Sequence, residues 1–364
     1  MPVSLKESCS VNLGFPYHHH KSPAKCLSNL LSSLTEQGHK CDENNTMFGN
    51  DHSAQLIEDR VARLLGTEAA LWLPTGTLAQ GIAARIHGQQ ANNKQLLLHP
   101  TSHLLLHEEQ GYQYAHGCSA KVVGKWREPF SACDISAGSG CAFIELPQRH
   151  SGGKLTSWNE LQKIKERCKT LNMPLHMDGA RLWSCRPFYD NRSYADIVTG
   201  FDSVYVSFYK DIGAIGGAAL AGSEAFIDDA RKWRTRLGGF SVGSWPLIYD
   251  ALYLIDKRLK QMPAFIEKAR VLAGTIRNIS GLHIDPLIPH TNLFHILLEV
   301  SADKAEFARD QIAKKHGIWL SDRFWNYGSP NSCAMEIVVG EKALAMADCI
   351  FAMAMTEFDT LLDP

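Results

Sequence analysis

A β-branched and aromatic run that ends in a lysine lies in the middle of the chain and reads SVYVSFYKDIGA over residues 203–214. Its first half has the composition of a buried strand, and Lys210 follows where such a strand would end. Gly213 follows three positions after Lys210, where a glycine lets the backbone approach a bulky ligand closely. We interpret Lys210 as a candidate nucleophile at a strand end. The alternative is an ordinary exposed lysine in a loop.

A second strand with an acid at its end lies upstream and reads HMDGAR over residues 176–181. Proteins that bind pyridoxal phosphate (PLP) pair an acid with the pyridine nitrogen and use a lysine to form a Schiff base with the cofactor. Asp178 and Lys210 offer these two groups after successive strands. Asp178 alone would more often be a turn former, so the combination carries the interpretation.

The composition is that of an ordinary globular protein, with 45% apolar and 21% charged residues in a chain of 364. This length accommodates a large α/β domain and a smaller one. The net charge of −1, without a strongly basic run, gives no support to a nucleic acid or an anionic membrane as partner. The first residues lack the apolar core of a signal peptide, and no run is long enough to cross a bilayer. We expect a cytoplasmic protein that binds a small molecule.

Ten cysteines are scattered along the chain without a C-x-x-C pair. This spacing indicates reduced thiols that serve packing, so we expect no disulfide bond and no metal site. Three consecutive histidines, His18 to His20, cannot all reach one metal ion from a helix or a strand. The sequence leaves open whether one of them approaches the active site.

Strands and helices alternate along the first two thirds of the chain. Strands are expected over residues 69–73, 96–98, 141–146, 174–177 and 202–208, and apolar residues at helical spacing mark the helices between them. One further strand, over 216–222, is expected to pair antiparallel across a tight turn. This order predicts an α/β fold with a mostly parallel, doubly wound sheet.

The chain is expected to have three parts. Residues 1–50 form an irregular segment with one helix, residues 51–260 the large domain, and residues 261–364 a small α+β domain. The small domain has predicted strands over 295–300 and 335–339 and predicted helices over 302–316 and 342–362. A helix over 245–258 is expected at the end of the large domain and another over 263–276 at the start of the small one, because Pro263 suits the first turn of a helix.

A Thr-Gly-Thr turn over residues 75–77 joins a predicted strand to a helix. Free backbone N–H groups and the positive end of the helix dipole bind phosphate at such a turn, so Gly76 and Thr77 are candidates; the alternative is a simple helix cap. His103 is a candidate for stacking on an aromatic cofactor, or else a histidine satisfied by local backbone. Glu108 and Glu109 follow it, and their roles depend on which of them points inward.

The order of these motifs resembles the threonine aldolase and β-eliminating lyase family of fold-type-I PLP enzymes. The element Asp-Gly-Ala-Arg-Leu over 178–182, followed at this spacing by Lys210, is the most specific part. The resemblance extends from about residue 46 to 260. It also includes Leu64-Leu65-Gly66, Pro74-Thr75-Gly76-Thr77, Ser102-His103, Glu145, Gly152-Gly153 and Ser203-Val204.

The resemblance implies a seven-stranded sheet, a PLP cofactor and a role for each motif. It implies that Lys210 forms the Schiff base, Asp178 holds the pyridine nitrogen, and His103 stacks on the ring. Arg181 is implied to lie near the cofactor O3′ and the substrate carboxylate. The residues implied to contact the phosphate are Gly76, Thr77 and Ser207.

The resemblance also implies an activity and an assembly. The activity is cleavage of the Cα–Cβ bond of a β-hydroxy-α-amino acid to an amino acid, such as glycine, and an aldehyde. The assembly is a homodimer or a homotetramer. The alternatives are β-elimination, racemisation or transamination of another amino acid, and a PLP-fold protein without catalysis.

Two positions depart from the family pattern and keep these alternatives open. Gln148 stands where the family usually has a histidine, and an amide cannot accept a proton as a base; His150 is two positions further on. Glu336 aligns with the arginine that usually binds the substrate carboxylate, so Arg181 is left to bind it alone or with another arginine. The candidates for substrate contact are Arg181, Glu108, Gln148, His150, Arg323 and Arg149.

Overall fold

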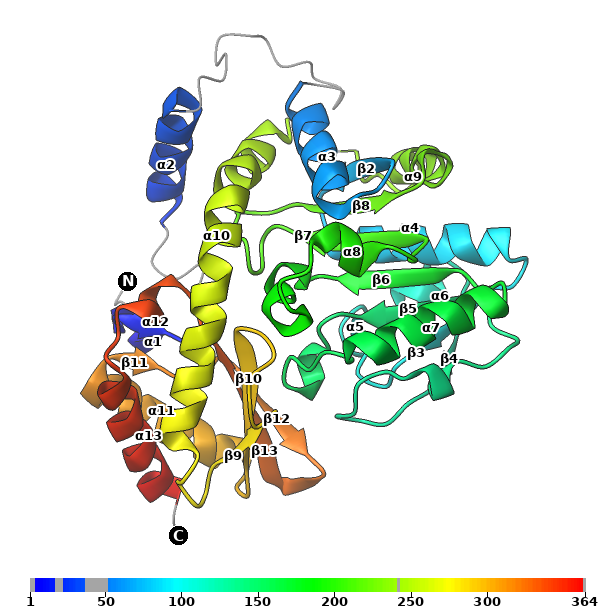
Figure 1. Cartoon of the computed structure of the whole chain (residues 1–364). Coiled ribbons are helices and arrows are strands. Elements are labelled where there is room, and N and C mark those ends of the chain that lie inside the picture. Colours follow the sequence, from blue (N-terminus) through cyan, green and yellow to red (C-terminus); the bar gives the residue numbers. More distant parts are fainter. Residues whose placement is uncertain (1–3, 17–21, 37–51, 241–242, 363–364) are drawn as a thin grey trace. The chain divides into compact units, whose positions relative to one another are not determined.

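The computed structural model describes residues 4–16, 22–36, 52–240 and 243–362, which form two compact units (Figure 1). The larger unit holds the described residues of 22–148 and 155–259. The smaller unit holds those of 1–21, 149–154 and 260–364. His18 to His20 lie outside the described residues.

A seven-stranded sheet forms the centre of the larger unit, in the order β2-β8-β7-β6-β5-β3-β4. β8 is antiparallel to β2 and to β7, and the other neighbouring strands run parallel. The predicted mostly parallel sheet is therefore confirmed. The strands are β2 (Ala69–Leu73), β3 (Gln95–Leu98), β4 (Ser119–Val122), β5 (Cys141–Glu145), β6 (Leu175–Gly179), β7 (Ser203–Ser207) and β8 (Ala218–Gly222).

Helices cover both faces of this sheet (Figure 1). The three strands β6, β7 and β8 are buried at every position, as expected where both faces of a sheet are covered. The main helices are α3 (His52–Leu65), α4 (Gly76–Gln90), α7 (Trp158–Thr170), α8 (Tyr194–Val198) and α9 (Glu224–Arg236); α4 packs with α9, and α3 packs with α8. The unit also contains α2 (Pro23–Glu36), α5 (His103–Leu106) and α6 (Gly111–Tyr114).

The smaller unit is an α+β structure built on a four-stranded antiparallel sheet in the order β12-β13-β10-β9. These strands are β9 (His283–Asp285), β10 (Leu293–Leu298), β12 (Phe324–Tyr327) and β13 (Ser329–Val338), and a separate parallel pair joins β1 (Val11–Asn12) to β11 (Ile318–Trp319). Its helices are α1 (Leu5–Ser8), α11 (Ala302–His316), α12 (Glu341–Leu344) and α13 (Asp348–Leu362).

Two helix predictions at this end of the chain are wrong. The expected helix over 342–362 is divided into α12 and α13, and Lys268 stabilises the break because it donates to the carbonyl oxygen of Met346 and pairs with Asp348. The two helices expected around Pro263 are one continuous helix, α10 (Trp245–Ile276). Apolar residues remain buried before and after the proline, among them Ile255 and Phe265. Their packing outweighs the backbone hydrogen bond that proline cannot form.

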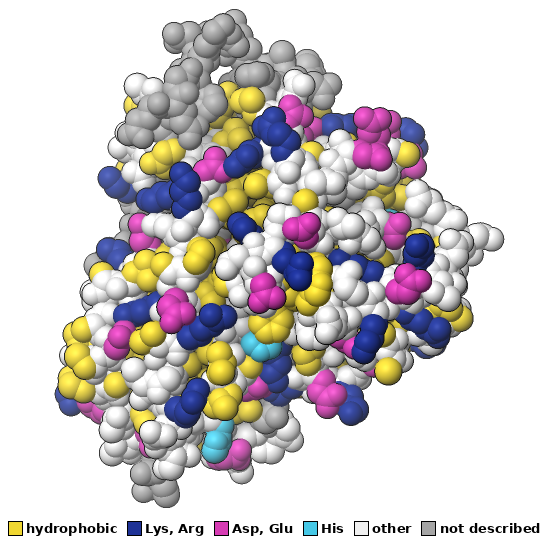
Figure 2. Space-filling view, viewed as in Figure 1, with side chains coloured by type: hydrophobic (Ala, Val, Ile, Leu, Met, Phe, Trp, Pro, Cys, Tyr) yellow, Lys and Arg dark blue, Asp and Glu magenta, His cyan; other side chains and the backbone are white. Residues whose placement is uncertain are grey.

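Charged side chains of both signs lie on the face of the molecule that Figure 2 shows. Lysine and arginine side chains alternate with aspartate and glutamate across the visible face (Figure 2), without an extended patch of one sign. None of the helices within the described ranges is both long and apolar enough to span a membrane.

Candidate active site

Three adjacent strands of the large sheet bring polar residues to one edge. Glu145 of β5 pairs in register with Asp178 of β6, and Asp178 pairs with Tyr205 of β7. Lys210 follows three residues after the end of β7. Because these strands are parallel, the loops that follow them emerge at the same edge. The sheet thus places the candidate acid and the candidate lysine on the same side of the unit.

Asp178 is a buried carboxylate, with 5% of its surface exposed. Its Oδ1 atom accepts a hydrogen bond from the backbone N–H of Ala180 at 3.1 Å. Burial raises the pKa of Asp178, and the nearby Lys210 and His103 oppose that rise. A positive group against this carboxylate would stabilise its ionised form. The protonated ring nitrogen of PLP is such a group, so the residue fits the cofactor.

Two tyrosines surround the Lys210 side chain. Its Nζ atom lies 5.9 Å from the ring centroid of Tyr205 and 5.7 Å from that of Tyr209. The two hydroxyl oxygens are 3.3 Å apart. Neither tyrosine was predicted as a site residue, because aromatic residues in and after a buried strand are expected for packing alone.

The amino end of α4 lies against these tyrosines. Thr75 caps the helix, since its Oγ1 accepts from the N–H of Leu78 at 3.2 Å. A side chain at Gly76 would overlap the hydroxyl of Tyr205, which explains the glycine. The Tyr209 hydroxyl also forms a hydrogen bond with the backbone of Gly76. The turn that holds Gly76 and Thr77 is therefore next to the tyrosines that surround Lys210, as a phosphate site for a cofactor at Lys210 requires.

Ser207 lies at the end of β7. It is fully buried, and its hydroxyl donates to the carbonyl oxygen of Ala180 at 2.7 Å. The carbonyl oxygen of Ser207 accepts from the indole N–H of Trp183 at 2.9 Å. Ser207 thus joins the end of β7 to the loop after β6. Its hydroxyl proton is thus donated within the protein, and the expected contact with phosphate stays a prediction.

His103 and Glu108 form a hydrogen-bonded pair. The distance between His103 Nδ1 and Glu108 Oε1 is 2.9 Å, and the side chains are 32% and 3% exposed. Burial raises the pKa of Glu108 to about 7, although Lys210 acts to lower it. Of the two successive glutamates, Glu108 is the buried one and Glu109 is exposed. The pair therefore combines a buried acid that titrates near neutral pH with a partly accessible imidazole.

Arg181 is held by a residue that the sequence did not single out. Its Nη1 atom donates to Asp211 Oδ1 at 2.9 Å, and both side chains are almost completely buried. Burial raises the pKa of Asp211, and Arg181 is the main opposing influence. No periodic pattern could have predicted this pair, because it joins the loops that follow β6 and β7.

Gln148 lies in the larger unit and is buried. Its Oε1 atom accepts a hydrogen bond from the backbone N–H of Phe130 at 3.0 Å. The residue at the position of the family's histidine thus has a structural contact in this chain.

The remaining candidates for substrate contact belong to the smaller unit. Arg149 forms two hydrogen bonds with Glu336, from Nε at 2.7 Å and from Nη2 at 2.6 Å. The ring centroids of Trp325 and His150 are 4.8 Å apart. The guanidinium of Arg149 lies 5.3 Å from the centroid of the Trp325 ring. Arg323 is exposed and lies just before β12. Glu336 is therefore neutralised by Arg149 within this unit.

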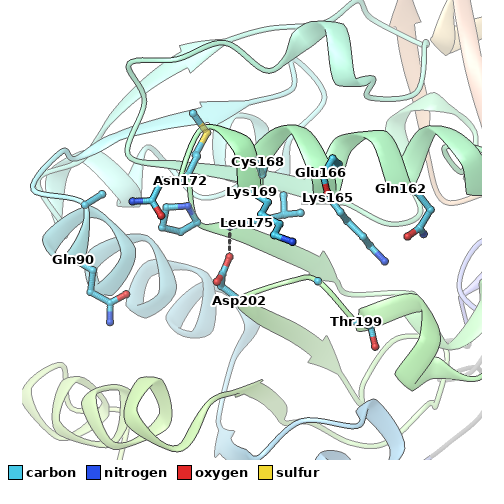
Figure 3. A pocket seen from close by; sticks show the side chains of 14 residues that line it. Gln90, Gln162, Lys165, Glu166, Cys168, Lys169, Asn172, Leu175, Thr199 and Asp202 are labelled. Carbon is cyan, nitrogen blue, oxygen red and sulfur yellow. Dashed lines mark hydrogen bonds between the residues drawn. The ribbon is translucent and has the colours of Figure 1, made fainter.

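One cavity of the larger unit lies at the other edge of the sheet. It has a volume of about 710 Å³ and is lined by residues that precede β6 and β7 (Figure 3). There the Asp202 carboxylate accepts from the N–H of Leu175 at 2.7 Å. Since Lys210 follows the opposite end of β7, this cavity is not the candidate active site.

Known proteins are similar to this chain in sequence and in fold. The sequence profile described as β-eliminating lyase matches residues 34–296. Low-specificity L-threonine aldolase 1 of Arabidopsis thaliana is 27% identical over 274 residues, which cover 70% of this chain and 74% of that protein.

Two solved structures are similar over nearly the whole chain. A candidate L-allo-threonine aldolase of Listeria monocytogenes has a TM-score of 0.87 and 33% identity, with 98% of each chain covered. A candidate aromatic amino acid β-eliminating lyase or threonine aldolase of Exiguobacterium has a TM-score of 0.88 and 28% identity, with 99% of each chain covered. The chain belongs to the β-eliminating lyase family and is a PLP-dependent lyase of the threonine aldolase type.

Proposed function

We propose that this protein cleaves the Cα–Cβ bond of a β-hydroxy-α-amino acid and releases an amino acid, such as glycine, and an aldehyde. The observation that carries the proposal is the group formed by Asp178, Lys210, His103 and Glu108 at one sheet edge, in which the charges of Lys210 and His103 act on the buried acids. The threonine aldolases among the similar proteins support the same reaction.

The residues at this edge suit PLP, and each has a task. PLP, when bound, supplies a ring that accepts the electrons of the broken bond. Asp178 would keep the proton on the ring nitrogen, and Lys210 would hold the cofactor through its amine. His103 would pack on the ring, and the turn at Gly76 and Thr77 would bind the phosphate.

Arg181 is the residue that we assign to the substrate carboxylate. Its guanidinium presents several donors in a plane and matches a carboxylate well. Glu336, at the position of the family's arginine, carries the opposite charge and already binds Arg149. It cannot attract a carboxylate, so the assignment to Arg181 gains weight.

The proton of the β-hydroxyl group needs an acceptor, which we assign to the pair of His103 and Glu108. Gln148 cannot act as a base, and its amide oxygen is bound to Phe130. A carboxyl group whose pKa is about 7 exchanges protons readily at neutral pH. Glu108 would take the proton through His103, whose Nδ1 is hydrogen-bonded to it.

We also propose a homodimer or a homotetramer that works in the cytoplasm. The support for the oligomer is the family resemblance. The support for the compartment is the scattered arrangement of ten cysteines, which is typical of reduced proteins.

The test is an aldehyde assay on the purified protein supplied with PLP. L-threonine, L-allo-threonine and β-phenylserine are offered in turn, and the released aldehyde is measured by its enzymatic reduction with NADH. Lys210→Ala is the negative control. Release of aldehyde by the wild-type protein and its loss in Lys210→Ala are the expected results. Release of ammonia and a 2-oxo acid in place of any aldehyde would overturn the proposal; that acid is 2-oxobutanoate from the two threonines and phenylpyruvate from β-phenylserine.

A further inference from the structure

The residue directly after the candidate nucleophile is a buried acid. Asp211 is completely shielded from solvent, and its Oδ1 accepts from Arg181 Nη1 at 2.9 Å. The Ser184 hydroxyl donates to the carbonyl oxygen of Arg181 at 2.9 Å, and its proximity lowers the pKa of Asp211. The three residues therefore form one buried unit that links the loop of the acid Asp178 to the loop of Lys210.

Stability alone does not explain this pair. Transferring two charges into the interior costs desolvation energy, and a buried ion pair is often no more stabilising than apolar residues of similar volume. Burial acts on Asp211 in this way, since it raises the pKa of that carboxyl group. The buried pair of Asp211 and Arg181 costs desolvation energy and lies next to the candidate lysine. A requirement of the reaction for one orientation of Arg181 explains the pair more simply than stability does.

We propose that Asp211 is a positioning residue that fixes the guanidinium of Arg181 for binding the carboxylate of the substrate. The inference rests on the proposed function for the role of Arg181. A carboxylate bound to Nη1 restricts rotation of the planar guanidinium, so its remaining donors keep one direction. This matters more here than in a site with two arginines, because Glu336 stands where a second arginine is expected.

The decisive measurement is discrimination between glycine and glycinamide. The two differ in the carboxylate, so the ratio of their dissociation constants reports on Arg181. Both are titrated into the holoenzyme by absorbance, with Asp211→Asn compared with the wild type. We expect the dissociation constant of glycinamide divided by that of glycine to fall by about 10- to 100-fold, because a small displacement of a binding group causes a loss of this size. We also expect KM for the amino acid substrate to rise by a larger factor than kcat falls.

Glu58→Gln is the matched control. Glu58 also pairs with an arginine, Arg231, at 2.7 Å, but it belongs to α3 and is not part of the proposed site. This variant is expected to change the midpoint of thermal unfolding of the apoprotein and to leave the discrimination ratio unchanged. An unchanged ratio in Asp211→Asn, with only a lower unfolding midpoint, would show a purely structural role and overturn the proposal.

A milder variant decides the question if Asp211→Asn does not fold. Ser184→Ala removes one hydroxyl from the buried unit and is expected to reduce the same ratio about threefold, whereas an unchanged ratio contradicts the inference.

The proposed function and the proposed role of Asp211 can fail independently. If the wild type binds glycine more tightly than glycinamide and Asp211→Asn does not, the role of Asp211 is supported even where no aldehyde is formed. If aldehyde is formed and the ratio is unaffected, only the role of Asp211 fails.

Discussion

Glu336 and Arg149 form a two-pronged ion pair inside the smaller unit, with N–O distances of 2.7 and 2.6 Å. Glu336 is 3% exposed and Arg149 is 14% exposed, so solvent screens the pair only weakly. His295 also approaches Glu336, at 3.9 Å. The position at which the family usually has an arginine that binds the substrate therefore holds a glutamate, and this glutamate forms an ion pair with Arg149 within the smaller unit.

The first prediction concerns the stability that this pair provides. Glu336→Leu leaves Arg149 charged without its carboxylate, which should lower the free energy of unfolding by about 3–5 kcal/mol. The double variant Arg149→Met/Glu336→Leu removes both charges and should lie within about 1 kcal/mol of the wild type. Urea unfolding of the three apoproteins makes the comparison. A double variant as unstable as the single one would contradict this interpretation.

The second prediction is a pH dependence that depends on Glu108. The folded-state pKa of this carboxyl group is about 7, above its ordinary value of 4.5. Its contribution to stability is therefore complete below about pH 4.5 and is lost as pH rises through 7. Glu108→Gln cannot ionise, so relative to the wild type it should gain stability between pH 5 and pH 8, by about 3 kcal/mol at most.

Thermal unfolding of the apoproteins at both pH values measures this gain, and Glu109→Gln, at the exposed neighbour, is the control without such a gain. The same Glu108→Gln variant should lower kcat by about 100-fold or more if the carboxyl group accepts the proton. If the difference in stability between Glu108→Gln and the wild type does not change with pH, Glu108 has an ordinary pKa in the folded protein and this prediction fails.

The third prediction tests the turn at the start of α4. Gly76→Ala places a methyl group on the Tyr205 hydroxyl, so Tyr205 must move. We expect a loss of about 1–3 kcal/mol in stability and weaker binding of PLP by the apoprotein. Gly111→Ala is the matched control, because Gly111 also begins a helix and a methyl group there meets nothing within 4 Å. Equal affinity of both variants for PLP would refute the placement of the phosphate.

The sequence was sufficient for the sheet because burial leaves a strong pattern. The interiors of strands such as β5 and β7 are apolar runs, and the polar residues at and after their ends were predicted to share an edge. β4 was missed, since this short edge strand is partly exposed and lacks such a run. The helix through Pro263 was missed because tertiary packing, not local propensity, maintains it.

The candidate site was predictable only in part for a similar reason. Asp178, Lys210 and Gly76 carry local signals, namely a strand end or a glycine turn. Asp211 does not, because its partner is 30 residues away and no sequence spacing records a contact between two loops. The inward direction of Glu108 likewise depends on backbone geometry: Glu109 and the residue after it have positive φ values.

The last prediction separates stability from function at Asp178. Burial raises the pKa of this carboxyl group, so its ionised form destabilises the apoprotein at neutral pH. Asp178→Asn should therefore unfold at a higher temperature than the wild type at pH 8, with the difference shrinking as pH falls. Its aldehyde release should fall by at least about 100-fold, because an amide cannot hold the proton on the ring nitrogen. Asp202→Asn, at the opposite edge of the sheet, controls for loss of an aspartate in general. An Asp178→Asn protein that is both less stable and still active would show that this acid serves the fold and not the cofactor.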